Sequence, residues 1–71
     1  MVQQHNYTFK YSYLADNENM AIQHFKKIKR QILQLDPQAQ FRTKWNYLNN
    51  KMYIVIDFSN LGCKSIFELS L

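Results

Sequence analysis

The chain has 71 residues, a net charge of +4 and a single cysteine, and these values limit what it can be. This length gives one domain over residues 1–71, and 46% hydrophobic with 15% aromatic content is too high for a disordered tail. One cysteine excludes an internal disulfide and a cysteine-rich zinc site, and one glycine excludes a glycine-rich phosphate loop.

The chain also lacks the sequence signals of a membrane or secreted protein. No stretch approaches the roughly 18 apolar residues of a membrane span. The first six residues, Met1 to Asn6, lack the basic and then apolar layout of a signal peptide. We therefore expect a cytoplasmic protein with no membrane partner.

The segment 7–13 alternates aromatic residues with small or charged ones. Strict alternation with period two predicts a strand that buries one face, and tyrosine and phenylalanine suit such a half-buried surface. The aromatic positions are Tyr7, Phe9, Tyr11 and Tyr13.

Residues 17–35 carry the apolar spacing of an amphipathic helix. Asp16 or Asn17 offers an N-cap, and Asp36 precedes Pro37, which disfavours helical angles at the residue before it. Apolar residues recur every three or four positions on one stripe. These are Ala21, Phe25, Ile28, Ile32 and Leu35.

Two further strands are predicted at 41–48 and 52–58. The first alternates, with Phe41, Trp45 and Tyr47 on one face, and the second is apolar on both faces, as in a central strand. Asn49–Asn50 lies between them, and asparagine tolerates positive φ, so a two-residue hairpin turn is expected.

The last segment, 63–71, follows a turn at 59–62 and fits two structures. Cys63, Ser65, Phe67 and Leu69 alternate as in an edge strand, whereas Ser65 and Glu68 match a capping box that opens a helix. The edge strand is favoured because little chain remains for a helix.

These elements predict a small single-domain α+β fold, β-α-β-β with an optional fourth strand. One amphipathic helix packs on one face of a three- to four-stranded, mostly antiparallel sheet. A single helix about 10 Å wide cannot cover all the aromatic residues of that face. An exposed aromatic interaction surface is therefore expected, formed by Tyr7, Tyr11, Tyr13, Trp45 and Tyr47.

Two basic groups are candidate sites for nucleic acid. Lys10, Arg42 and Lys44 fall with Tyr53 on the uncovered sheet face, where cations neutralise phosphates and an aromatic ring stacks on a base. Lys26, Lys27 and Arg30 project from the helix. Each group is also what an ordinary solvated surface would carry, and the sequence motif of RNA-recognition domains is absent.

No catalytic, metal or cofactor site is predicted. His5 and His24 have no partner at a useful spacing, and Cys63 has no matching histidine and acid. Asp57, near the end of a central strand, is the acidic residue most suited to chemistry, although such residues more often cap turns.

The predicted class is a small non-enzymatic binding module that contacts nucleic acid or a ribonucleoprotein. One alternative is a phage-type or mobile-element-type inhibitor that docks on a host nuclease or a CRISPR-type defence complex. Another is a small toxin-like ribonuclease dependent on His24 or Asp57. A homodimer is compatible with each of these.

Overall fold

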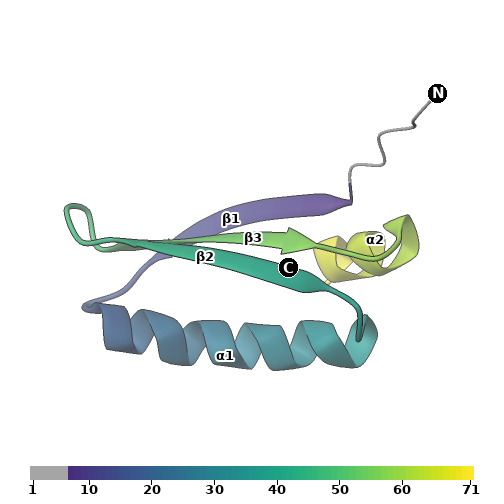
Figure 1. The fold of residues 1–71 in the computed structure, drawn as a ribbon, viewed down its shortest axis with the longest axis horizontal. Helices are drawn as coiled ribbons and strands as arrows, with labels where there is room; N and C mark the ends of the chain where they lie inside the picture. Colours follow the sequence, from purple (N-terminus) through teal and green to yellow (C-terminus); the bar gives the residue numbers. More distant parts are fainter. Residues whose placement is uncertain (1–6) are drawn as a thin grey trace.

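The computed structural model of the chain describes residues 7–71 as a three-stranded sheet and two helices (Figure 1). The strands are β1 (Thr8–Leu14), β2 (Gln40–Asn46) and β3 (Lys51–Asp57), and the helices are α1 (Glu18–Leu35) and α2 (Leu61–Leu69). Two predictions concern residues 1–6, which lie outside the described part: the one for His5 and the absence of a signal peptide.

The sheet has the order β1-β3-β2, with β3 antiparallel to both neighbours. β1 and β2 are therefore parallel to each other, and α1 makes the crossover between them. This is a split β-α-β arrangement, in which a third strand separates the two connected ones. The predicted α+β class, the antiparallel sheet and the central position of 52–58 are confirmed.

Helix α1 begins and ends close to where the sequence indicates. Asn17 is the N-cap, and its side chain accepts a hydrogen bond of 2.9 Å from the Met20 N–H. The stripe on α1 packs on one face of the sheet, as the layers in Figure 1 show. The buried core residues are Ala21, Ile32, Ala39, Met52, Ile54, Ile56, Phe58 and Phe67.

The edge strand favoured for 63–71 is wrong, because Leu61–Leu69 form helix α2. Asn60 caps it, accepting a hydrogen bond of 2.8 Å from the Cys63 N–H, so the helix also starts earlier than a capping box at Ser65 implies. Phe67 is buried against the rings of Phe9 and Phe58, at centroid distances of 5.4 and 5.7 Å.

The hairpin between β2 and β3 is longer than predicted. β2 ends at Asn46, and Tyr47–Asn50 form the turn instead of Asn49–Asn50 alone. The Asn46 side chain ends the strand by accepting a hydrogen bond of 2.9 Å from the Leu48 N–H. Asn50 has a φ of 53°, in the left-handed region that asparagine tolerates.

A buried carboxylate joins the end of α1 to the turn before α2. Asp36 accepts hydrogen bonds of 2.7 Å from both the backbone N–H and the hydroxyl of Ser59, and one of 3.2 Å from the Gln38 N–H. Burial by itself would raise the pKa of Asp36. The hydrogen bonds outweigh that effect and hold the pKa below its ordinary value of 3.8.

Candidate nucleic-acid interface

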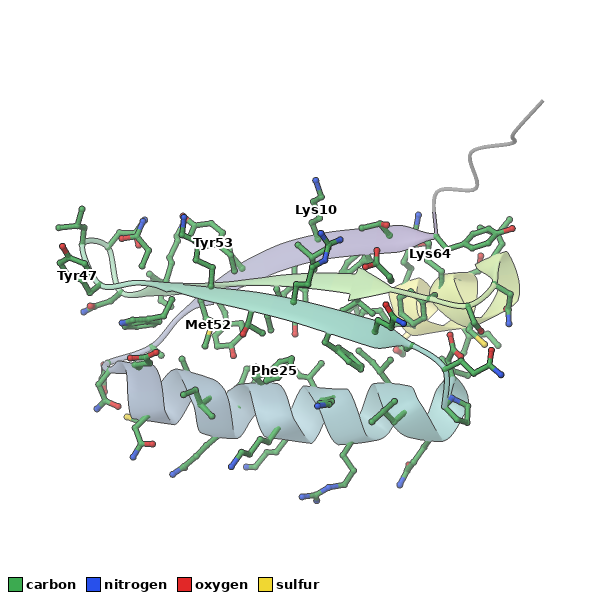
Figure 2. The ribbon with its side chains drawn as sticks, viewed as in Figure 1. Lys10, Phe25, Tyr47, Met52, Tyr53 and Lys64 are labelled. Atoms are coloured by element: carbon green, nitrogen blue, oxygen red, sulfur yellow. The ribbon has the colours of Figure 1, made fainter. Side chains whose placement is uncertain are left out.

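The sheet face away from α1 collects the basic and aromatic residues that the alternation assigns to it. In the strand register, Val55 lies between Lys10 and Arg42, and Tyr53 lies between Ser12 and Lys44. Figure 2 shows Lys10 and Tyr53 projecting from one side of the sheet, with Met52 and Phe25 on the other. Lys10, Arg42, Lys44 and Tyr53 are therefore brought together.

Tyr53 lies at the middle of this face, on the central strand. Its side chain is 38% exposed, and its hydroxyl accepts a hydrogen bond of 3.2 Å from the Asn49 side-chain amide. A shallow hollow of about 280 Å³ lies beside it, between β1 and β3. The hollow is lined by Lys10, Tyr11, Ser12, Tyr53, Ile54 and Val55.

Arg42 is less available to a ligand than the lysines. Its guanidinium forms an ion pair of 3.0 Å with Asp57, which also accepts a hydrogen bond of 2.7 Å from the Thr8 hydroxyl. Within residues 7–71 this is the one ion pair found, so Lys10 and Lys44 have no acidic partner there. The uncovered face therefore presents Lys10 and Lys44 near Tyr53 without acidic partners in this part of the chain.

Lys51 belongs to the same face, although sequence reasoning did not select it. Lys51 lies two residues from Tyr53 on β3, between Leu14 of β1 and Asn46 of β2. The period-two alternation that identified Tyr53 is the signal that could have found it.

The second basic group lies on the other side of the molecule. Lys26, Lys27 and Arg30 are exposed on α1, which covers the opposite face of the sheet. Lys29 differs from them, since its ammonium lies 5.9 and 5.7 Å from the ring centroids of Phe25 and Phe41. The two basic groups are therefore separate surfaces and cannot both contact one short ligand.

Only part of the aromatic surface that we expected to be exposed is exposed. Tyr47, in the hairpin turn, is 76% exposed, because the early end of β2 removes it from the covered face. The other four pack against the core and are half-buried: Tyr7, Tyr11, Tyr13 and Trp45. The Tyr13 hydroxyl donates a hydrogen bond of 2.6 Å to the Ala21 carbonyl, which joins β1 to α1.

Tyr11 carries the one buried side-chain polar atom that lacks a hydrogen-bond partner within the described part of the chain. Burial, with a smaller repulsion from Tyr13, raises the pKa of its hydroxyl from 10.0 to about 12. The fold therefore favours the protonated form. This contribution to stability is present below pH 10.0 and is lost as the pH rises from 10.0 through about 12.

We expect Tyr11→Phe to reduce the loss of stability on going from pH 10 to 12 and to remove a late step from the tyrosinate absorbance titration. Chemical denaturation at several pH values measures the first effect. The loss is reduced and not abolished, because burial also raises the pKa of Tyr13. Identical pH profiles for wild type and variant would contradict this assignment.

The histidine and acid of the ribonuclease alternative do not meet. The His24 ring packs edge-on against Tyr13, at a centroid distance of 4.5 Å, on the covered face near the end of β1. Asp57 pairs with Thr8 at the start of β1, on the uncovered face. Residues 7–71 hold no group of three His, Cys, Asp or Glu side chains that would bind a metal.

Comparison with known proteins gives no further guide. No family model matches the chain, and no match was found among curated proteins or solved structures. Neither described helix is long and apolar enough to cross a membrane. Function is therefore inferred from the surface chemistry of the molecule.

Proposed function

We propose that this protein is a small non-enzymatic module that binds nucleic acid, free or within a ribonucleoprotein, in the cytoplasm. The binding surface is the uncovered face of the sheet. The observation that carries the proposal is the exposed ring of Tyr53 on the central strand, with Lys44 directly across on β2 and Lys10 diagonally across on β1. A base stacks on the ring while the ammonium groups contact the flanking phosphates.

The test measures binding of a fluorescent single-stranded RNA by anisotropy at several salt concentrations. We expect the logarithm of the affinity to fall linearly with the logarithm of salt, with a slope of about −0.7 per phosphate neutralised. Lys10→Glu with Lys44→Glu should weaken binding by about tenfold or more at moderate salt, since two phosphate contacts become repulsive.

A matched control distinguishes the effect of this face on binding from the effect of net charge. Lys26→Glu with Lys27→Glu on α1 alters the same number of charges, so both double variants have a net charge of zero instead of +4. The α1 variant should stay within about threefold of wild type, because only long-range attraction is lost. Equal losses in both variants would contradict a site on the sheet.

Two further substitutions test the chemistry of the face. Tyr53→Ala should weaken binding by roughly 5- to 150-fold and Tyr53→Phe far less, because stacking contributes about 1–3 kcal/mol per base and needs only the ring. Asp57→Asn should strengthen binding, because it frees Arg42 from its ion pair. Unchanged binding with Tyr53→Ala and weaker binding with Asp57→Asn would indicate a merely solvated face.

The second candidate, an inhibitor that docks on a host nuclease or defence complex, is favoured by a different surface. The hairpin turn presents Tyr47 and Leu48, and Leu14 at the end of β1 is also largely exposed. Exposed apolar groups at one end of a small domain are typical of protein docking. Under this function Tyr47→Ser and Leu48→Ser abolish binding to the target protein, and added salt has little effect.

A further inference from the structure

The outer edge of β1 presents hydrogen-bonding backbone groups away from the sheet. The Phe58 N–H donates to the Tyr7 carbonyl and the Ala15 N–H donates to the Asn50 carbonyl, both at 3.0 Å. In an antiparallel pair such contacts recur at every second residue. The odd-numbered residues of β1 therefore bond to β3, and the N–H and carbonyl groups of Lys10, Ser12 and Leu14 face outward.

No strand within residues 7–71 pairs with that edge, since β1 is terminal in the order β1-β3-β2. Its covered face carries Phe9, Tyr11 and Tyr13, which remain half-buried. Of these three residues, Tyr13 contacts α1, through the hydrogen bond of its hydroxyl to Ala21 and the packing of its ring on His24. An open edge flanked by partly exposed aromatic rings is suited to pairing with another strand.

The charged residues on the two edge strands, β1 and β2, differ in whether they allow two copies of the chain to pair. On β2 the outward-facing backbone groups belong to odd-numbered residues. If the β2 strands of two copies paired antiparallel near their centres, Arg42 or Lys44 of one copy would lie directly opposite an arginine or lysine of the other. Like charges in opposite positions are destabilising. On β1, Lys10 is the only charged residue, and full overlap of two copies sets it opposite Ser12.

We propose that a second copy of this chain pairs antiparallel with the outer edge of β1, with the two Tyr11 residues opposite each other at the centre. Phe9 of each copy then lies opposite Tyr13 of the other, and such aromatic cross-strand pairs stabilise a sheet. The two sheets become one continuous sheet, with both α1 helices on the same side.

The ends of the two molecules also complement each other in this arrangement. Phe67 of α2 packs against Phe9, so α2 lies at the start of β1 (Figure 1), whereas exposed Leu14 and Met20 lie at the other end. Antiparallel pairing makes the α2 end of one copy the neighbour of the Leu14 end of the other. The exposed Leu61, Ile66 and Leu69 of α2 in one copy are thus brought toward the exposed Leu14 end of the other.

The test is the molar mass of the nucleic-acid-free protein by sedimentation equilibrium over a range of concentrations. We expect wild type to reach twice the 8.6 kDa mass of the chain. Ser12→Pro removes an outward-facing N–H and leaves the bonds to β3 intact, so it should raise the dimer dissociation constant by at least about tenfold. Thr43→Pro, at an outward-facing position on β2, is the matched control and should dimerise as wild type does.

The effect of salt on binding distinguishes dimer formation from the proposed binding of nucleic acid. Two copies each carrying +4 repel, so added salt should strengthen the dimer, whereas it weakens nucleic-acid binding. Backbone hydrogen exchange of wild type is the second measurement. The amides of Lys10, Ser12 and Leu14 should gain protection with concentration, and those of Thr43 and Trp45 should not. A monomer at all concentrations, or equal protection of both edges, would overturn the proposal whether or not RNA binds.

Discussion

Replacing Asp36 with alanine is expected to lower the free energy of unfolding by about 3 kcal/mol, because hydrogen bonds to a charged group contribute roughly 1.5–3 kcal/mol each and are not additive. The carboxylate is buried and accepts three hydrogen bonds, two of which, from Ser59, join the end of α1 to the turn before α2. Without it, two donors of Ser59 lose their partner. Urea denaturation monitored by circular dichroism measures the change.

The pH dependence of stability gives an independent measure of the same group. The pKa of Asp36 is lower in the fold than its ordinary 3.8, so its contribution is complete well above pH 3.8 and is lost as the pH falls through 3.8 to the folded value. Asp36→Asn should flatten this part of the profile. Arg42→Ala, which removes a surface ion pair and leaves Asp57 its hydrogen bond from Thr8, should cost no more than about 1 kcal/mol. A loss for Arg42→Ala as large as that for Asp36→Ala would refute the role assigned to Asp36.

Ile56→Ala is expected to have the other large effect, a loss of about 3–4 kcal/mol. Ile56 is 0% exposed and lies on the central strand between Phe9 of β1 and Phe41 of β2. Truncation removes buried apolar surface and leaves a cavity that the flanking strands cannot close. Because a domain of this size has roughly 4–10 kcal/mol of stability, a large part of it would be lost.

The control for Ile56 is the same substitution on an exposed helix surface. Ile66 of α2 is 55% exposed, and alanine has the higher helix propensity, so Ile66→Ala should change stability by no more than about 0.5 kcal/mol. Thermal and urea unfolding of the two variants should therefore differ widely. If Ile66→Ala proved as costly as Ile56→Ala, α2 would be buried against something other than this chain.

Most of the fold follows from the sequence because the patterns are long and consistent. The alternation from Tyr7 to Tyr13 and the apolar stripe of α1 each repeat over several periods, so one exception does not change the interpretation. The same alternation placed Lys10, Lys44 and Tyr53 on one face, which the strand register confirms. What that face binds stays a prediction.

The parts that sequence reasoning missed are decided by single side chains. Asn60 caps α2, and Cys63 and Phe67, four residues apart, share a helix face as well as alternate positions of a strand. A short segment with both patterns is resolved only by its tertiary contacts. Likewise, the ion pair of Arg42 with Asp57 depends on residues 15 positions apart being placed on adjacent strands.

The position of β3 between β1 and β2 has a consequence for how the chain folds during synthesis. When residues up to Asn46 have left the ribosome, the nascent chain has two strands but lacks the one that both of them pair with. The sheet, and with it the surface on which α1 packs, can form only after residues 51–57 emerge. Folding is therefore delayed until after β1, α1 and β2 have been made, and any fragment that stops before residue 51 should be without a sheet.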